Sequence, residues 1–254
     1  MDGMTAFCES TYLLARFCPP VLNGWLRGQR WQRWVTRTAR VPGAHVVQGP
    51  GSLTLFGLPA ASGLAHELDT VGAYPGWSVM TEAKAYERHG PTKNDVCIFD
   101  RKTFDFYITL RRRSVAGPHW RVIASASPMD DRVRRYCYLY GIIAVDSLLV
   151  PLPVLLSVAA KPEADQWLPE VLLTEAVRLG ELAAGPLESR YMPDGPDHLR
   201  FNATALNERD LDDLLWVQKT LSDELLDLVD RERPWYYERR AEALLGRLGI
   251  AIAA

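Results

Sequence analysis

The chain has 254 residues, of which 48% are hydrophobic and 24% are charged, and its 29 basic and 31 acidic residues give a formal net charge of -2. This composition excludes the disordered, collagen-like and low-complexity classes, because the apolar content is ample for a buried core and no residue type is extreme. At roughly 100 to 200 residues per domain, we expect one domain with an appended piece.

The small net charge conceals an uneven distribution along the chain. Residues 1–128 contain 15 Lys and Arg against 9 Asp and Glu, a balance of +6, whereas residues 129–254 contain 14 against 22, a balance of -8. A basic half joined to an acidic half indicates that one part faces a polyanion while the other stays solvated or meets a different partner. The total charge therefore does not exclude a nucleic-acid partner.

The cysteines and the N-terminal residues bear on cellular location. The four cysteines are spaced too widely for a CxxC metal clip, and no charged-then-apolar leader opens the chain. We therefore expect a cytoplasmic protein with free thiols at Cys8, Cys18, Cys97 and Cys137.

The most apolar stretch, residues 137–160, is long enough to raise the question of a membrane span. Asp146, Pro151 and Pro153 interrupt it. We read this stretch as a helix end, a buried strand and a loop, and we expect no contact with a membrane.

Gly and Pro residues divide the first part of the chain into short elements. The patterns predict, in chain order, a helix over 22–39, strands over 45–48 and 52–56, a hairpin of strands 64–74 and 77–86, a helix over 93–112, a strand over 119–125, a helix over 130–140 and a buried strand over 142–149. This order predicts an α/β layer architecture with a mixed central sheet over residues 1–155. Residues 156–254 read as a mostly helical, acidic C-terminal extension, with the longest helix over 211–230.

The predicted hairpin contains the residues that best suit chemistry. Side chains alternate along a strand, so Glu82 and Lys84 share one face, and Asp69 shares it from the neighbouring strand if the register allows. Two carboxylates held close together repel each other, and a hard divalent cation is the usual remedy. The pattern therefore favours a metal site.

Magnesium fits such a site in a way that suggests a reaction. Mg²⁺ prefers one or two carboxylates together with waters and a substrate phosphate, and it lowers the pKa of a bound water. The adjacent Lys84 can orient or help to deprotonate that water and offset charge in the transition state. This set of residues is suited to hydrolysis of a phosphodiester bond.

At these residues the sequence resembles the PD-(D/E)XK nuclease superfamily, particularly its restriction-endonuclease-like and Mrr-like members. Asp69 matches the motif Asp, and Glu82 and Lys84 match its ExK. Residues 28–35 are similar to the family's first core helix, and residues 122–146 to its closing strand-helix-strand. The similarity extends over residues 23–153.

The resemblance implies a restriction-endonuclease-like mixed sheet flanked by helices and a Mg²⁺-dependent endonuclease acting on DNA, with Mn²⁺ able to substitute. It implies Asp69 and Glu82 as metal ligands and Lys84 as the residue that positions water. It also makes a role in restriction or anti-phage defence plausible.

One position departs from the family pattern. The first core helix of active members usually supplies a glutamate toward the metal, and the matching residue here is Gln32. A glutamine can hold a water or ligate weakly through its carbonyl, but it adds no negative charge. We expect Glu67, two residues before Asp69, to replace that glutamate in part as a further metal ligand.

Five arginines recur at helical spacing in the predicted first helix, with no acidic residue from 22 to 41. They would form one stripe that contacts DNA phosphates, or else an ordinary solvated face opposite a core-facing Trp31, Trp34 and Val35. Contact of all five with phosphates would give a log-log salt slope of about -4.5. The stripe consists of Arg27, Arg30, Arg33, Arg37 and Arg40.

Further basic clusters at 111–113 and at Arg132, Arg134 and Arg135 read more simply as surface charge. The histidines lack HxH or HExxH spacing, which disfavours a zinc site, and His66 reads as a structural histidine. The sequence has no phosphate-binding GxxxxGK[ST] loop, no strand-linked GxGxxG and no GxSxG elbow. We therefore expect no nucleotide cofactor.

Two alternatives to a DNA-cleaving enzyme remain open. The departure at Gln32 and the acidic extension motivate a catalytically degenerate nuclease fold that acts as a nucleic-acid-binding or scaffold subunit of a larger complex. The ExK triplet can also be incidental, because such triplets are common on solvated strands. We expect the C-terminal helices to serve packing or oligomerisation, in a homodimer or in a larger complex.

Overall fold

A computed structural model describes most of the chain. The described residues are 3–17, 24–86, 89–115, 117–161, 164, 169–193, 199–201 and 206–250.

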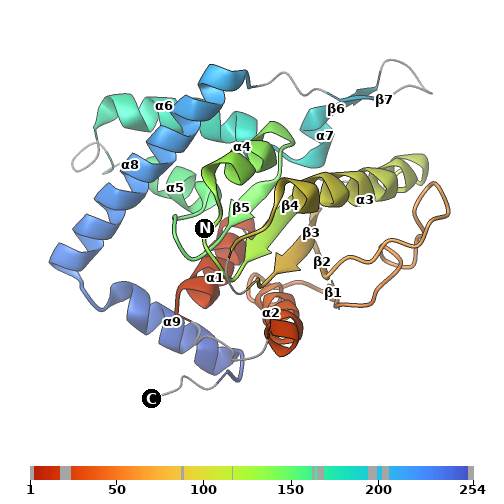
Figure 1. Ribbon diagram of the computed structural model, residues 1–254, viewed down its shortest axis with the longest axis horizontal. Coiled ribbons are helices and arrows are strands. Elements are labelled where there is room, and N and C mark those ends of the chain that lie inside the picture. Colours follow the sequence, from red (N-terminus) through yellow and green to blue (C-terminus); the bar gives the residue numbers. More distant parts are fainter. Residues whose placement is uncertain are drawn as a thin grey trace.

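A five-stranded mixed sheet lies at the centre of the molecule (Figure 1). Its strands are adjacent in chain order, with β1, β2 and β3 forming an antiparallel meander and β3, β4 and β5 running parallel. The parallel steps require crossovers, which α3 and α4 supply. The strands are β1 (Val46–Gln48), β2 (Thr70–Tyr74), β3 (Trp77–Lys84), β4 (His119–Ser125) and β5 (Ile143–Val145).

Helices cover both faces of this sheet, as the predicted α/β class requires. A separate two-stranded sheet pairs β6 (Tyr191–Pro193) with β7 (Leu199–Phe201). The helices are α1 (Gly3–Phe17), α2 (Gly24–Thr38), α3 (Lys93–Arg112), α4 (Asp131–Leu139), α5 (Leu152–Ala159), α6 (Glu170–Ala183), α7 (Leu187–Arg190), α8 (Glu208–Glu232) and α9 (Tyr236–Arg247).

Two hydrophobic clusters lie on opposite faces of the sheet. Alternation along β3 sends Val79 and Ala83 to the cluster formed with α1, α2, α5 and α9, and Met80 to the cluster formed with α3, α4 and α6. Helix α8 contributes Val217 and Leu221 to the first cluster and other leucines to the second. Elements from both ends of the sequence thus share the core.

Buried polar contacts join the C-terminal helices to the rest. The Tyr138 hydroxyl of α4 donates to Gln218 Oε1 of α8, and Gln218 Nε2 donates to the Val150 carbonyl at 3.0 Å. Arg240 of α9 donates to Glu9 of α1. The domain boundary between residues 155 and 156 stays a prediction. Residues on the two sides of it pack against each other.

The predictions for the middle of the chain are confirmed most closely. Helix α3 and strand β4 have the predicted bounds of 93–112 and 119–125. Thr92 and Asp95 form a capping box that begins α3, and Asp130 caps α4 by accepting from the Arg132 amide. Local signals define the starts of both helices, because a side-chain cap precedes each of them.

Other predicted elements are wrong in extent. No strand forms over 52–56, where Ser52 and Leu55 make only isolated bridges, and β2 begins at Thr70 instead of residue 64. Strand β5 ends at Val145, because the Asp146 carboxylate accepts from the amides of Leu148 and Leu149 and turns the chain. The patterns also missed α1 and the pair β6 and β7.

One arginine read as surface charge lies in the core instead. Arg134 is fully buried and pairs with Asp146, which also accepts from the Met129 amide at 2.5 Å. Asp146 thereby joins helix α4 and the loop after β4 to the loop after β5. Such a pair needs its partner, because a single buried charge is costly.

Within the described residues, no helix is long and apolar enough to cross a membrane. Cys8, Cys97 and Cys137 form no disulfide bond among the described residues, and Cys18 lies outside them.

We predict that Gly117 is essential for placing β4 beside β3. Gly117 has a φ of +112°, and a Cβ there would lie 2.5 Å from the Gly76 carbonyl oxygen. Gly117→Ala should lower the free energy of unfolding by about 1–3 kcal/mol, measured by urea denaturation. Gly246→Ala is the control, since nothing lies within 4 Å of its Cβ position in α9, and it should add about 0.5 kcal/mol. Equal effects of the two substitutions would contradict this role.

Candidate active site

The predicted acidic residues meet where β2 begins and β3 ends. The register pairs Thr70 with Thr81, so the next residues outward, Asp69 and Glu82, are opposite one another. Helix α2 packs against this point, because Thr36 Oγ1 lies 2.7 Å from Thr70 Oγ1 and Trp31 Nε1 donates to the Ala124 carbonyl at 3.0 Å.

Asp69 is buried and connects three elements. Its Oδ1 accepts from Gln32 Nε2 of α2 at 2.8 Å, and its Oδ2 accepts from the Ala83 amide of β3 at 2.7 Å. Burial first, and then the charge of Glu82, raise the pKa of the Asp69 carboxyl from 3.8 to about 6. The two carboxylates therefore sense each other electrostatically.

Glu82 is buried and has two lysine partners. Lys84 Nζ donates to Glu82 Oε1 at 2.8 Å, and Lys102 Nζ of α3 lies 3.3 and 3.4 Å from the two Glu82 oxygens. Lys102 also donates to the Glu67 carbonyl at 3.0 Å. The two ammonium groups balance the charges of Asp69 and Glu82.

Lys84 is held in its charged form. Burial alone would lower the pKa of the Lys84 ammonium, but the carboxylates of Glu82 and Asp69 outweigh it and raise the pKa above its ordinary value. Asp95 Oδ1 lies 3.8 Å away and accepts from the Tyr86 hydroxyl at 2.8 Å. Lys84 thus acts as a hydrogen-bond donor at neutral pH.

The auxiliary residues are placed differently from one another. Gln32 is in contact with Asp69, as described above. The Glu67 side chain is exposed and accepts from the Gly51 amide at 2.8 Å, so only its main-chain carbonyl faces the cluster through Lys102. The structure therefore brings together Gln32, Asp69, Glu82 and Lys84.

The sequence reasoning missed Lys102 and Asp95. Both lie on one face of α3, seven residues apart, with the buried Phe99 between them. The sequence shows this spacing, but it does not show which strand packs against this face of α3.

Acidic side chains by themselves do not provide a complete set of metal ligands at this site. Among the described residues, no group of three or more His, Cys, Asp and Glu side chains is arranged to hold a metal ion. The Lys102 ammonium nevertheless occupies a cation position, surrounded by the Glu82 carboxylate and the Glu67 carbonyl. Oxygen donors of these kinds are those that Mg²⁺ prefers.

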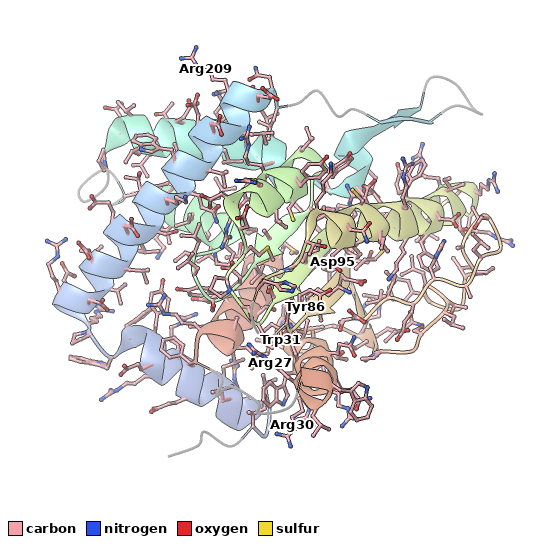
Figure 2. The ribbon with its side chains drawn as sticks, viewed as in Figure 1. Arg27, Arg30, Trp31, Tyr86, Asp95 and Arg209 are labelled. Carbon is pink, nitrogen blue, oxygen red and sulfur yellow. The ribbon has the colours of Figure 1, made fainter. Side chains whose placement is uncertain are left out.

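The predicted arginine stripe divides into two parts, and its last member, Arg40, lies beyond the end of α2 at Thr38. Arg27 donates to Ser127 Oγ at 3.1 Å, near Tyr86 at the end of β3 (Figure 2). Arg37 donates to the Leu248 carbonyl at 2.9 Å and so caps the end of α9. Arg30, Arg33 and Arg40 are exposed.

Two adjoining cavities of about 320 and 350 Å³ separate α2 from the end of α9. The described residues that line them include no acid. Five arginines line them, namely Arg30, Arg33, Arg37, Arg40 and Arg247. The last comes from the acidic half of the chain, so the basic surface is larger than the sequence pattern indicated.

No family model, no curated protein and no solved structure matches this chain.

We predict that Asp69 makes folding stability fall as pH rises. Its pKa is raised in the folded chain, so its contribution is fully present below pH 3.8 and is lost as pH rises to about 6. As pH rises from 4 to 7, the free energy of unfolding of Asp69→Asn should increase by up to about 3 kcal/mol relative to that of the parent chain. Urea denaturation with EDTA present measures this difference.

Asp105→Asn provides a control of opposite sign. Burial raises the pKa of the Asp105 carboxyl, but hydrogen bonds from Ser62 and His66 outweigh it and lower the pKa overall. Its contribution should therefore be lost as pH falls. A pH-independent difference for Asp69→Asn would show that its carboxyl is not perturbed.

Proposed function

We propose that this protein is a metal-dependent nuclease of the PD-(D/E)XK type that hydrolyses phosphodiester bonds of DNA. The observation that carries the proposal is the meeting of Asp69, Glu82 and Lys84 at the end of β3, with Glu82 and Lys84 on one face. Residues 13 to 15 positions apart form one cluster only because the hairpin register aligns them. Restriction or anti-phage defence is the cellular role that the family resemblance suggests.

The order of elements supports the same proposal. Helix α2, the meander of β1 to β3, helix α3, strand β4, helix α4 and strand β5 follow one another as the resemblance implies for residues 23–153. The ExK lies on a strand of the central sheet, the context in which that motif has chemical meaning, instead of on a solvated surface strand.

The residues of the cluster fit a magnesium ion. Glu82 and Asp69 offer carboxylate oxygens and Glu67 offers a carbonyl oxygen, while Lys102 marks a position where a cation is stabilised. When bound, Mg²⁺ would polarise the phosphate and lower the pKa of a bound water.

The chain's own residues then position and balance charge. The protonated Lys84 Nζ would donate to the attacking water or to a phosphate oxygen, where negative charge develops. Gln32 Nε2 fixes the orientation of Asp69, and Asp95 with Tyr86 limits the positions that Lys84 can adopt.

A nucleic-acid-binding subunit without catalysis is the second candidate. Two contacts favour it: Gln32 contributes an amide where active members usually have a carboxylate, and Lys102 already neutralises Glu82. In that case the cluster would be a structural ion network. The arginine surface would then carry the function alone.

A cleavage assay with a lysine variant separates the two candidates. Plasmid and linear DNA are incubated with the protein and Mg²⁺ or Mn²⁺, and we expect cleavage that Lys84→Ala reduces by about 100-fold or more. Lys219→Ala should cleave normally, because Lys219 pairs with Asp131 at the surface between α8 and α4. The assay should include single-stranded DNA and RNA.

The outcomes divide clearly. Equal cleavage by the parent chain and Lys84→Ala would refute the catalytic assignment. Binding of DNA that persists with EDTA, without cleavage of any substrate, would support the binding subunit.

The arginine surface between α2 and α9 provides an independent prediction about DNA binding. Arg30 and Arg33 form no ion pair within the described residues, so each is available to a phosphate. Replacing either with Gln should reduce the log-log salt slope of DNA binding by about 0.9, measured by fluorescence anisotropy with EDTA present.

Arg209→Gln is the matched control. Arg209 is 91% exposed and lies at the far end of α8 from Arg30 (Figure 2). It removes the same charge and should leave the slope unchanged. An equal change for all three variants would mean that net charge, and not this surface, governs binding.

A further inference from the structure

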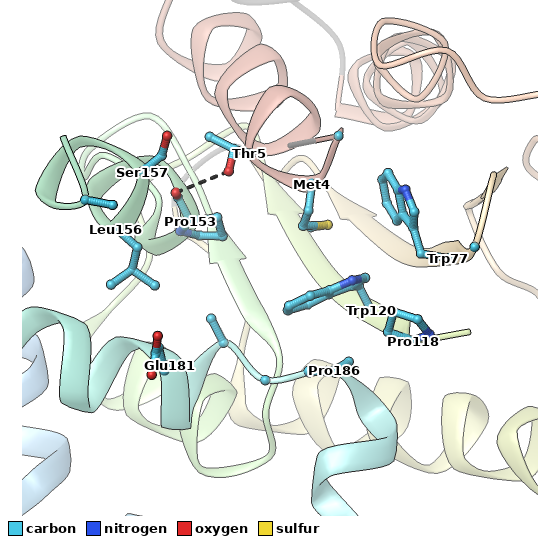
Figure 3. Close-up of a pocket in the computed structure, with 15 residues that line it drawn as sticks. Met4, Thr5, Trp77, Pro118, Trp120, Pro153, Leu156, Ser157, Glu181 and Pro186 are labelled. Carbon is cyan, nitrogen blue, oxygen red and sulfur yellow. Dashed lines mark hydrogen bonds between the residues drawn. The ribbon is translucent and has the colours of Figure 1, made fainter. Parts of the chain in front are cut away.

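A large cavity lies far from the cluster of Asp69, Glu82 and Lys84. It has a volume of about 680 Å³ and opens between the first turn of α1, helix α5, the end of α6 and the starts of β3 and β4 (Figure 3). Trp77 and Trp120 face it from the side of the sheet that packs against α1. Glu82 and Lys84 lie at the other end of β3 and on its other face. This cavity has no part in the proposed hydrolysis.

Ring stacking and hydrogen bonds hold the walls of the cavity in place. The Trp77 ring stacks on Tyr74 with centroids 3.7 Å apart and planes 4° apart, and the Tyr74 hydroxyl donates to the Ala39 carbonyl at 2.6 Å. Thr5 Oγ1 donates to the Pro153 carbonyl at 3.4 Å, which joins α1 to α5 (Figure 3). The cavity is therefore preformed, and a ligand would lose little free energy in ordering it.

The lining has a specific chemical character. Two indole rings and Met4 form one apolar wall, and three prolines lie among the other residues. Glu181 is the one charged residue among the described residues that line the cavity, and Figure 3 shows it across the cavity from Trp120. Its carboxylate has no ion-pair partner in the described part of the chain.

These features select among ligands. A volume of this size and an apolar aromatic lining are typical of sites for small organic molecules. The Glu181 carboxylate attracts a cation, and the indole rings and Met4 offer packing to an apolar body. An anion would meet the carboxylate without any basic residue among the described lining residues.

We propose that this cavity binds a small organic cation, an ammonium group carried on an apolar or aromatic body. The body packs between Trp77, Trp120 and Met4, and the ammonium faces Glu181. The inference does not depend on the proposed nuclease activity, because no residue of the carboxylate cluster takes part.

The test uses the intact chain and two probes of similar size. Benzyltrimethylammonium supplies the cation, and 3-phenylpropan-1-ol supplies a neutral aromatic molecule. Binding is followed by the indole N–H signals of the 15N-labelled protein, with those of Trp77 and Trp120 assigned from Trp77→Phe and Trp120→Phe. We expect the cation to shift these two signals and to bind about three- to tenfold more tightly than the alcohol.

Two charge variants decide the role of Glu181. Glu181→Gln should abolish the preference for the cation, whereas Glu170→Gln, an exposed acid of the same helix outside the cavity, should retain it. Equal binding of the two probes to the parent chain, or a preference that survives Glu181→Gln, would overturn the proposal. Absence of any shift at Trp77 and Trp120 would overturn it as well.

Discussion

The arrangement of the candidate active site depends on the Asp69 carboxylate. Asp69 directly precedes β2, and its two oxygens accept from Gln32 of α2 and from the Ala83 amide of β3. One buried group thereby fixes a helix and two strands relative to each other. The cost is visible in its pKa, raised to about 6 by burial and by Glu82. A group held at such a cost is more typical of a functional site than of ordinary packing.

The charges around Asp69 are balanced within the protein. Lys84 comes from the same strand as Glu82, whereas Lys102 comes from α3, and together they offset the two carboxylates. This balance lowers the electrostatic cost of holding the two carboxylates close together. It also defines what a divalent ion must do, since binding at Glu82 would compete with Lys102. If the protein is a nuclease, Glu82 binds the divalent ion in preference to Lys102. If it is a binding subunit, Glu82 stays paired with Lys102.

The C-terminal helices contribute both to the hydrophobic core and to the basic surface. They fill both core clusters, and α9 places Arg247 beside the arginines of α2. The acidic half of the chain thus completes a basic surface. At the end of β3 away from Asp69 and Glu82, α5 and α6 close the aromatic cavity against α1. The site of Asp69, Glu82 and Lys84 and the aromatic cavity lie at different ends of β3, so each can be tested without disturbing the other.

The sequence by itself determined the elements with local signals: the extents of α3 and β4, the turn at Pro75 and Gly76, and the placement of Glu82 and Lys84 on one strand face. These depend on neighbours within a few residues. Only the tertiary structure decided that Lys102 meets Glu82, that Glu67 turns to Gly51, that Arg134 is buried and that Arg37 caps α9. Each of these contacts joins residues at least 12 positions apart, and the packing of helices on the sheet selects the partner for a charged side chain that propensity leaves open.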